Sequence, residues 1–272
     1  DEYDSAYFDK RPKFMHYRPQ SAVVSSVEFD HADIFADRAD YRGAFENFVG
    51  LLDDDGLLAL CGDDPDVRAL ADQTTATVRT YGLNPNNDVR AEDRTTTARG
   101  QTFTLRLNGK SEEVRFPHPG RHNVENALAA ALLAHREGAS LPEIAAGLAS
   151  FQGMKRRQEV RGCPNDVLVI DDFAHHPTAV QATVQALRAA HPDRRLVAIF
   201  EPRSNTSRRR LFQSKYAQAF DAADRVFLKA PPVRHNDDAD AMLDPDAVVQ
   251  TIRDRGTPAE TFDEVDAVLP TL

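Results

Sequence analysis

The chain has 272 residues and a formal net charge of −10, and 41% of its residues are hydrophobic. This length suits one large domain or two ordinary ones, and the acidic balance argues against broad binding to nucleic acid or to anionic membranes. No apolar run approaches the roughly 18–20 residues of a membrane span. Cys61 and Cys163 are the only cysteines, so a disulfide framework is not indicated and a reducing, cytoplasmic compartment is expected.

The first part of the chain mixes helical and strand patterns. It predicts strands at 21–27 and 56–62 and helices at 41–52 and 66–74. From Thr77 to Phe116 polar and apolar residues alternate, and Asn108-Gly109 lies between two alternating runs. Asn-Gly in this position is a strong signal for a two-residue hairpin turn. We therefore expect antiparallel strands throughout 77–116.

A pair of helices follows the alternating segment. The Ala-rich sequence HNVENALAAALLAHREG predicts a helix over about 122–138. Ser140 and Glu143 have the spacing of a capping box, which predicts a second helix that ends near residue 150. The basic connector FQGMKRRQEVRG follows, and it suggests a domain boundary near Gln152–Gly153.

Short apolar strands alternate with amphipathic helices after this boundary. The strands are expected within 167–171, 195–200, 225–229 and 259–262, and the helices from Pro177, from about Arg208 and from Pro245. Such alternation is typical of a parallel sheet that helices cover on both faces. The fold class is therefore α/β, and the final residues, DEVDAVLPTL, end within a helical pattern.

Charged side chains stand where two of these strands end. Asp171 and Asp172 follow VLVI, and Glu201 follows VAIF. Ligands of open parallel sheets bind beyond the carboxyl ends of the strands, so ligand binding is one interpretation of these side chains. The other interpretation is that Asp172 caps the next helix and that His176, which precedes Pro177, only shapes the turn.

The loop EFDHADIF places His31 between two aspartates, Asp30 and Asp33. An imidazole between carboxylates can bind a divalent metal, or the loop can simply be solvated. Because Mg²⁺ prefers oxygen ligands, the pattern by itself favours the solvated loop.

Two asparagines, Asn123 and Asn126, stand one turn apart at the start of the helix predicted over 122–138. An asparagine at a helix start is usually a cap, and this is the favoured interpretation for Asn123. Residues three apart share a helix face, and carboxamides can both donate to and accept from an adenine edge. Capping explains Asn126 less well.

Two basic clusters, MKRRQEVR and EPRSNTSRRR, occur in this acidic chain. Arginine forks suit phosphates and carboxylates, whereas most charge runs are solvated surface. Both clusters adjoin predicted strand ends or the domain boundary, where substrates commonly bind. The sequence has no P-loop, no motif for a nucleophilic Ser or Cys, no zinc-ligand spacing and no G-x-G-x-x-G fingerprint.

Taken in order, six motifs resemble those of the Mur ligase family. They are DEYDSAYFDKR, DHAD, HNVENALAA, KRRQEVRG, DDFAHHPTA and EPRSNTSRRR, and they span essentially the whole chain. The first and the last favour the members that add a tripeptide over those that add alanine. The resemblance implies that residues 1–152 are part of a central ATP-binding domain. Residues 153–272 would form a Rossmann-like C-terminal domain with a mainly parallel sheet and a clipped end.

The resemblance also implies a set of nucleotide-binding residues. Asn123 and Asn126 would lie beside the nucleotide, with Asn126 at the adenine. Asp172 would hold the ribose hydroxyls, and His175 belongs to the same loop. These roles are carried over from the family's motifs and do not follow from the spacing alone.

Three further residues acquire roles from the resemblance. Arg157 would face the γ-phosphate of ATP, His31 would act beside a Mg²⁺ ion, and Arg203 would lie at the amino-substrate site. The implied reaction of peptidoglycan recycling joins L-Ala-γ-D-Glu-meso-diaminopimelate to UDP-N-acetylmuramate through an acyl phosphate. Such chemistry needs no protein nucleophile, and it implies small-molecule partners without nucleic acid or membrane.

The chain departs from the family pattern in two places. The P-loop, G-x-x-G-K-[ST] in form, is absent, and the chain opens at the third position of the E-A-D-E-x-D motif, whose leading Glu is a Mg²⁺ ligand in the family. We therefore expect a fragment that is inactive alone. Two alternatives remain: a related ligase of another cell-wall or folate substrate, and a non-catalytic fragment that binds a nucleotide or a partner.

Overall fold

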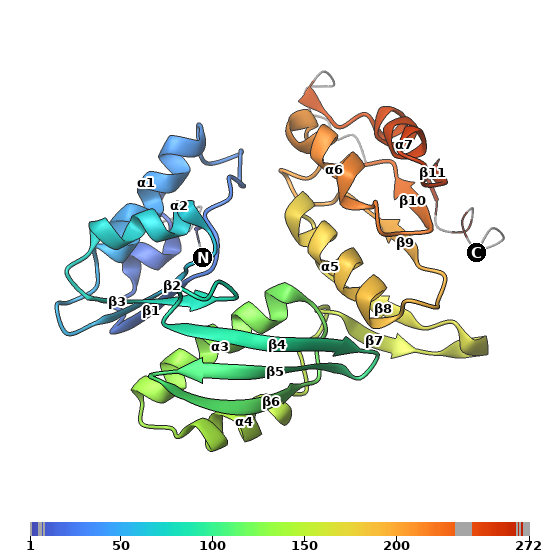
Figure 1. The fold of residues 1–272 in the computed structure, drawn as a ribbon. Helices are drawn as coiled ribbons and strands as arrows, with labels where there is room; N and C mark the ends of the chain where they lie inside the picture. The colour runs from blue at the N-terminus through green and yellow to red at the C-terminus, as the bar shows by residue number, and fades with distance from the viewer. Residues whose placement is uncertain are drawn as a thin grey trace. The chain divides into compact units, whose positions relative to one another are not determined.

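The computed structural model describes residues 2–4, 7, 9–231, 241–264, 266 and 268. The chain divides into two compact units, Asp1–Gln152 and Gly153–Leu272, and each unit has its own sheet and its own helices (Figure 1). None of the described helices combines the length and the apolarity that crossing a membrane requires.

The first unit is built on one six-stranded sheet with the order β1-β2-β3-β4-β5-β6. Its strands are β1 (Ser21–Val24), β2 (Leu57–Cys61), β3 (Thr77–Gly82), β4 (Val89–Thr97), β5 (Gly100–Leu107) and β6 (Lys110–Phe116). Strands β1 to β4 pair in parallel, and β4, β5 and β6 pair antiparallel. The expectation of antiparallel strands throughout 77–116 is therefore wrong for β3. A helical crossover connects β2 to β3, and such a connection returns the chain parallel to its start.

Helices lie on both faces of this sheet, with α1 and α2 on one face and α3 on the other (Figure 1). The helical elements are η1 (Lys13–His16), α1 (Arg38–Val49), α2 (Pro65–Arg68), η2 (Ala69–Gln73), α3 (Arg121–Arg136) and α4 (Leu141–Ala149). Helix α1 begins three residues before the predicted start because the Asp37 carboxylate accepts the amides of Ala39 and Asp40. The predicted capping box is confirmed, since Glu143 Oε2 accepts the amide of Ser140 at 2.9 Å.

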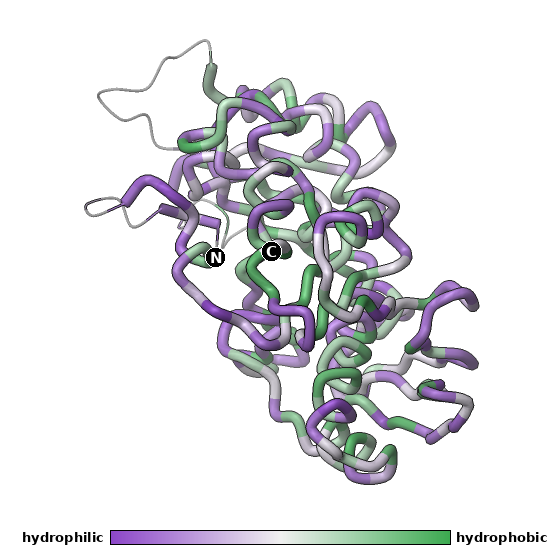
Figure 2. The backbone as a smooth tube through the Cα atoms, turned by 90° about the vertical axis from the view of Figure 1, so that its left-hand side faces the viewer, coloured by the Kyte–Doolittle hydropathy of each residue, from purple (hydrophilic) through white to green (hydrophobic). Residues whose placement is uncertain are grey.

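The hydrophobic core of the first unit lies between the sheet and these helices. All five residues of β2 are buried, and Val49 of α1 and Leu128 of α3 are fully buried. In Figure 2 the hydrophobic stretches of the chain alternate with hydrophilic loops and turns. Burying one leucine or valine side chain contributes about 1.5–3 kcal/mol, so the two-sided burial of β2 makes this strand the anchor of the unit.

The hairpin predicted at Asn108-Gly109 is confirmed. Leu107 pairs with Lys110 across a two-residue turn, and Asn108 and Gly109 have φ angles of 49° and 75°. Positive φ at both central residues is the geometry that favours Asn-Gly, because it matches the twist of the flanking strands.

The second unit contains a three-stranded parallel sheet, ordered β11-β10-β9, and a separate two-stranded hairpin. Its strands are β7 (Glu159–Gly162), β8 (Val169–Asp171), β9 (Val197–Phe200), β10 (Arg225–Lys229) and β11 (Ala259–Phe262). The sequence predicts VLVID as a strand of the parallel sheet, but β8 pairs antiparallel with β7. The short connection between β7 and β8 permits only antiparallel pairing.

Three α-helices pack with the parallel sheet around one core. The helical elements are η3 (Pro164–Asp166), α5 (Pro177–Ala190), η4 (Arg210–Phe212), α6 (Gln213–Ala219) and α7 (Pro245–Asp254). The starts of α5 and α7 are as predicted, whereas α6 begins five residues after the predicted Arg208. The delay arises because Ser204 Oγ accepts the amide of Ser207 at 3.1 Å and closes a separate turn. The predicted C-terminal helical pattern lies largely outside the described residues.

Two glycines of the first unit, Gly109 and Gly147, give a matched test of the turn at Asn108-Gly109. Gly109 has a φ of +75°, whereas Gly147 lies within α4, and a Cβ added at either would meet no atom within 4 Å. Gly109→Ala should destabilise the first unit by about 1–2 kcal/mol, because a side chain disfavours the left-handed region. Gly147→Ala should stabilise it by about 0.5–1 kcal/mol. Urea unfolding of the two variants measures both changes in the free energy of unfolding. Changes of the same sign in the two variants would contradict the assigned turn.

Candidate functional site

The carboxyl ends of β1, β2 and β3 meet at one edge of the first sheet, because the three strands are parallel. The segments that follow them, 25–37, 62–64 and 83–88, therefore start at the same edge. In open parallel sheets this edge is where ligands bind. The residues at this edge form the first group of candidate site residues.

Asp63 is the centre of the hydrogen bonds at this edge. Its carboxylate accepts the amides of Leu83 at 2.7 Å and Asn84 at 3.0 Å, the Asn87 carboxamide at 2.7 Å and the Arg121 guanidinium at 2.8 Å. Burial raises the pKa of Asp63, but these donors outweigh it and hold the pKa below its usual value. The carboxylate therefore stays charged and ties three separate segments together.

Gly82 allows the close approach of these segments. A Cβ on this glycine would lie 2.5 Å from the nearer carboxylate oxygen of Asp63. Asp63 is not marked by any motif in the sequence, since the run Gly62-Asp63-Asp64 resembles an ordinary turn. Its position two residues after the fully apolar strand β2 was the available signal.

Arg121 carries this network to the first turn of α3. Its guanidinium bonds Glu125 on the next turn at 2.8 Å as well as Asp63. Burial raises the pKa of Glu125, and the neighbouring Arg121 offsets part of that rise. The N-terminal turns of α3 are consequently fixed at the carboxyl edge of β2.

The two predicted asparagines lie on these turns. Asn123 is the third residue of α3, and its Nδ2 donates to the carbonyl of Pro119 at 2.7 Å. The helix is capped at Gly120 without a side-chain bond, so the favoured interpretation of Asn123 as the helix cap is wrong. The side chain of Asn126 is exposed one turn further on. Nucleotide binding by the two residues stays a prediction.

His31 lies in the loop after β1 and is half-buried. Its Nε2 is 2.7 Å from Glu2 Oε1, and its ring centroid is 4.1 Å from that of Tyr3. The bond to His31 is the main cause that lowers the pKa of Glu2. His31 also has a φ of 54°, a strained value for a residue other than glycine. The favoured interpretation, a solvated loop, is therefore wrong for His31, whereas Asp33 of the same loop is exposed.

The donor set around His31 does not complete a magnesium site. No group of three or more His, Cys, Asp or Glu side chains that could hold a metal ion occurs in the described parts of the chain. The one imidazole nitrogen that faces a carboxylate is already paired with Glu2. The described residues near His31 therefore do not by themselves form a complete set of metal ligands.

Asp172 follows β8 in the second unit and accepts two backbone amides. Its Oδ2 accepts the amide of Gln158 at 2.9 Å, and its Oδ1 accepts the amide of Ala174 at 2.7 Å. Helix α5 starts at Pro177 and is capped at His176, so the alternative in which Asp172 caps this helix is wrong. Asp172 instead joins the end of β8 to the residues before β7.

Arg157 and His175 lie near Asp172, around the ring of Phe173. The Arg157 guanidinium carbon is 5.8 Å from the Phe173 ring centroid, and the His175 ring is 5.3 Å from it. The His175 carbonyl accepts the hydroxyl of Tyr216, which fixes the loop to α6. The structure thus brings together three of the predicted residues, Arg157, Asp172 and His175, within one unit.

Arg203 and Glu201 follow β9 in the same unit. Arg203 is exposed, and Glu201 forms an ion pair with Lys229 of β10 at 3.3 Å. The substrate role of Arg203 stays a prediction. Asp171, the other carboxylate of the strand end, pairs with Glu159 across the β7–β8 ladder.

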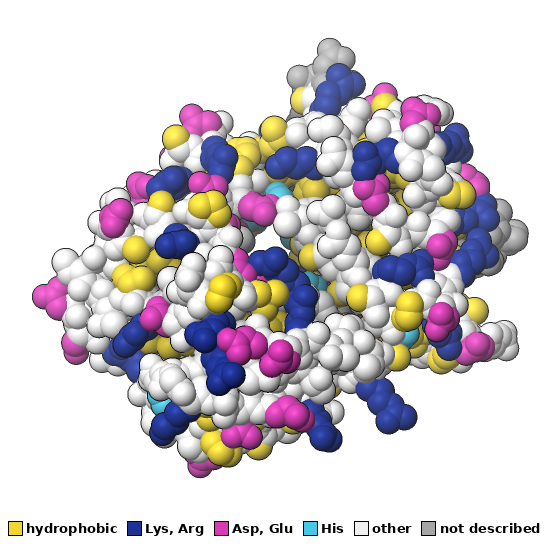
Figure 3. Space-filling view, viewed as in Figure 1, with side chains coloured by type: hydrophobic (Ala, Val, Ile, Leu, Met, Phe, Trp, Pro, Cys, Tyr) yellow, Lys and Arg dark blue, Asp and Glu magenta, His cyan; other side chains and the backbone are white. Residues whose placement is uncertain are grey.

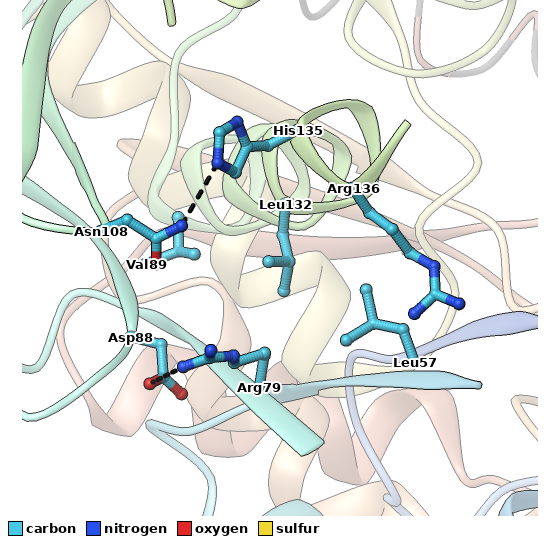
Figure 4. A pocket seen from close by; sticks show the side chains of 8 residues that line it. All are labelled: Leu57, Arg79, Asp88, Val89, Asn108, Leu132, His135 and Arg136. Carbon is cyan, nitrogen blue, oxygen red and sulfur yellow. Dashed lines mark hydrogen bonds and ion pairs between the residues drawn. The ribbon is translucent and has the colours of Figure 1, made fainter. Parts of the chain in front are cut away.

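A small cavity of about 150 Å³ lies elsewhere in the first unit. Figure 4 shows that Arg79 pairs with Asp88 and that Asn108 bonds His135. Arg136, another lining residue, donates to the carbonyl of Asp55. These lining side chains thus each have a partner within the chain. Basic and acidic side chains are interspersed over the visible faces of both units (Figure 3).

Two family models match the chain. The Mur ligase middle domain matches residues 2–134, and the Mur ligase, glutamate ligase domain matches residues 156–272. The chain therefore belongs to the Mur ligase family, and it carries the middle and C-terminal domain sequences.

Curated relatives point to two kinds of ligase. The chain is 37% identical over 233 residues to the UDP-N-acetylmuramate–L-alanyl-γ-D-glutamyl-meso-2,6-diaminoheptandioate ligase of Haemophilus influenzae, covering 85% of this chain and 51% of the relative. It is 39% identical over 216 residues to the UDP-N-acetylmuramate–L-alanine ligase of Nitratidesulfovibrio vulgaris, covering 79% and 47%. The chain spans about half the length of the curated relatives it matches.

Solved structures share the fold. A murein peptide ligase of Psychrobacter arcticus is 32% identical, with a TM-score of 0.64 over 100% of this chain and 55% of that one. The UDP-N-acetylmuramate–alanine ligase of Thermotoga maritima is 22% identical, with a TM-score of 0.73 over 95% and 54%. The α/β fold with one mixed and one parallel sheet is thus the fold of this family.

Asp63→Asn should test the network at the sheet edge. We expect a loss of about 2 kcal/mol in the stability of the first unit at pH 7, because bonds to a charged acceptor contribute about 1.5–3 kcal/mol. The folded pKa of Asp63 lies below its unfolded value. The difference between wild type and variant should therefore be complete above the unfolded pKa of about 3.9 and should vanish as the pH falls through the folded pKa.

Urea unfolding between pH 7 and pH 3 measures this difference. Asp72→Asn changes an exposed aspartate of η2 and should stay within about 0.5 kcal/mol of wild type. A loss in Asp63→Asn that did not change with pH would contradict the role of its charge.

Proposed function

We propose that this chain is part of an ATP-dependent ligase that forms an amide bond between a carboxylate and an amine. The observation that carries the proposal is the cluster of Arg157, Asp172 and His175 around Phe173. It lies in a chain that belongs to the Mur ligase family. A guanidinium and a carboxylate in one loop can bind a phosphate and ribose hydroxyls, respectively.

The proposed roles divide between the two units. In the second unit, Arg157 would stabilise the charge that develops on the γ-phosphate, and Asp172 would accept the ribose hydroxyls, with His175 in the same loop. In the first unit, Asn123 and Asn126 would lie beside the nucleotide. Arg203 would bind the amino substrate, which its exposed position after β9 permits.

The chemistry accounts for these residue types. A carboxylate oxygen attacks the γ-phosphorus of ATP and ADP leaves, which gives an acyl phosphate. The amine then attacks the carbonyl carbon, loses a proton, and inorganic phosphate departs with one oxygen of the original carboxylate. Charge on the transferring group is the main obstacle, and arginine forks and metal ions stabilise it. When bound, Mg²⁺ would neutralise phosphate charge; the described residues do not supply a full set of ligands for it, and the role of His31 beside the ion stays a prediction.

We propose further that the carboxylate substrate is UDP-N-acetylmuramate and that the amino substrate is L-Ala-γ-D-Glu-meso-diaminopimelate, in peptidoglycan recycling in the cytoplasm. The identity of 37% to the Haemophilus influenzae relative and the similarity to the murein peptide ligase support this choice. A second candidate adds L-alanine instead, and the 39% identity to the Nitratidesulfovibrio vulgaris relative supports it.

The 272 residues contain no P-loop sequence. Phosphoryl transfer depends on the positioning and charge that a phosphate cradle supplies. We therefore propose that these residues do not catalyse ligation by themselves and that the activity belongs to a gene product that also carries such a cradle. The alternative, a non-catalytic domain pair, predicts that the gene product binds nucleotide without turning it over.

Substrate choice tests the proposal. The gene product that contains this chain should ligate the tripeptide to UDP-N-acetylmuramate with a kcat/KM at least about tenfold above that for L-alanine. This factor corresponds to about 1.4 kcal/mol of differential transition-state binding. Arg203→Ala should raise the KM for the tripeptide and leave the KM for ATP unchanged.

The control is Arg99→Ala, which removes an exposed arginine from the β4–β5 turn and should leave both constants unchanged. Phosphate release and product formation are followed together. A preference for L-alanine would favour the second candidate, and ATP turnover that stayed absent with every amine would support the non-catalytic alternative.

A further inference from the structure

Arg157 lies between two strained residues. Arg156 and Gln158 have φ angles of 58° and 51°, in the left-handed region. For residues other than glycine this conformation costs about 1–2 kcal/mol each. Such strain persists only where the surroundings hold it, and it clusters at functional sites. The contacts that hold Arg156 and Gln158 therefore bear on how the Arg157 side chain is presented.

Both strained residues donate their amides to carboxylates. The amide of Arg156 donates to Glu159 Oε2 at 2.9 Å, and the amide of Gln158 donates to Asp172 Oδ2 at 2.9 Å. The carbonyl of Arg156 also accepts the amide of Phe173 at 2.8 Å. Hydrogen bonds to a charged acceptor are about twice as strong as neutral ones, so these bonds offset the cost of the strained backbone.

The two carboxylates are themselves fixed. Glu159 is the first residue of β7 and pairs with Asp171 of β8, and its Oε1 accepts Arg161 Nη1 at 3.0 Å. Asp172 follows Asp171 directly and accepts the amide of Ala174. The β7–β8 ladder therefore sets the spacing between the two acceptors and, through them, the backbone on either side of Arg157.

We propose that Glu159 and Asp172 form a carboxylate clamp that positions Arg157 for the reaction. The clamp consists of the two carboxylates and the amides of Arg156 and Gln158 that they accept. Glu159 is thus a positioning residue that acts through the backbone of Arg157. The proposal deepens the proposed function, because the role of Arg157 in phosphoryl transfer rests on it.

Glu159 tests the clamp more directly than Asp172. Each oxygen of Asp172 accepts one amide and retains a further lone pair, so Asp172 can bind ribose hydroxyls as well as hold the loop. A variant of Asp172 would therefore combine two effects. Glu159 has no proposed contact with substrate, and its loss should act only through Arg157. Misplacement of a catalytic group by about 1 Å can cost about 10²-fold in rate.

The first experiment measures kinetics in the gene product that contains this chain. Glu159→Ala should lower kcat by about 10- to 100-fold and leave the KM for ATP within about twofold, because ribose binding is kept. Glu159→Gln retains an acceptor oxygen and should recover part of the loss. In an Arg157→Ala background, Glu159→Ala should cause no further loss, since the two residues act as one unit. Equal losses in both backgrounds would overturn the proposal.

Glu113→Ala is the matched control. Glu113 lies on β6 and pairs with Arg115 two residues on, at 3.6 Å, as Glu159 pairs with Arg161 on β7. The control removes an ion pair of the same spacing without removing an acceptor for a strained amide. Its kcat should equal that of wild type, and a loss as large as that of Glu159→Ala would overturn the proposal.

The second experiment needs no ligase activity and uses the 272-residue chain. In Glu159→Ala, amide hydrogen exchange measured by NMR should speed up at Arg156, which loses its acceptor, and at Gln158, because the relaxed turn moves the Gln158 amide away from Asp172. The β7–β8 ladder should keep its protection. Added to Glu159→Ala, Arg156→Gly should restore the protection at residue 158, because glycine adopts a positive φ without strain. Unchanged exchange at Arg156 would overturn the clamp. An inactive wild-type gene product would refute the proposed function and leave the clamp to this second measurement.

Discussion

Carboxylates at strand ends organise both units, because the loops that leave a sheet carry backbone amides without ladder partners. Such amides must find an acceptor when they are buried. Asp63, which follows β2, accepts the amides of Leu83 and Asn84 after β3. Asp172, which follows β8, accepts the amides of Ala174 and of Gln158, the residue before β7. Glu159 accepts a third in the second unit. The same charged groups that could contact a ligand thus build the loops that present the other candidate residues.

This constraint explains why the candidate residues lie where they do. A charged acceptor can hold a strained turn that neutral groups would not, and strained turns expose side chains at defined positions. In the second unit, the two carboxylates of the clamp hold the backbone on either side of Arg157. In the first unit, the bond between Arg121 and Asp63 holds the first turns of α3. An amide ligase of this kind needs such fixed groups, since its catalysis is mostly positioning and charge stabilisation.

Much of the fold could be predicted from the sequence, because local signals agree with it. The hairpin at Asn108-Gly109 and the capping box at Ser140 are confirmed, since each depends on residues that are neighbours in the sequence. The pairing of β3 and of β8 was predicted wrongly, because strand direction depends on connections that periodicity does not show. Alternation in sequence indicates a strand and its buried face, and it does not indicate the partner strand.

The candidate site was predicted in part. Motifs indicated Arg157, Asp172 and His175, which the structure places together, because a motif records residue types at fixed spacing. Asp63 and Glu159 were missed, since their partners are backbone amides of residues that no motif marks. His31 was interpreted as part of a solvated loop, but its partner Glu2 is 29 positions away and could not be inferred from its neighbours.

The proposed reaction depends on an acyl phosphate intermediate, and the fate of one carboxylate oxygen reports whether this intermediate forms. UDP-N-acetylmuramate labelled with ¹⁸O in its carboxylate would be incubated with the gene product, ATP, Mg²⁺ and the tripeptide, and the inorganic phosphate would be analysed by mass spectrometry. We expect one labelled oxygen in the phosphate for each amide bond formed, because that oxygen bridges carbon and phosphorus before the amine attacks. Amide formation with no label in the phosphate would contradict an acyl phosphate intermediate.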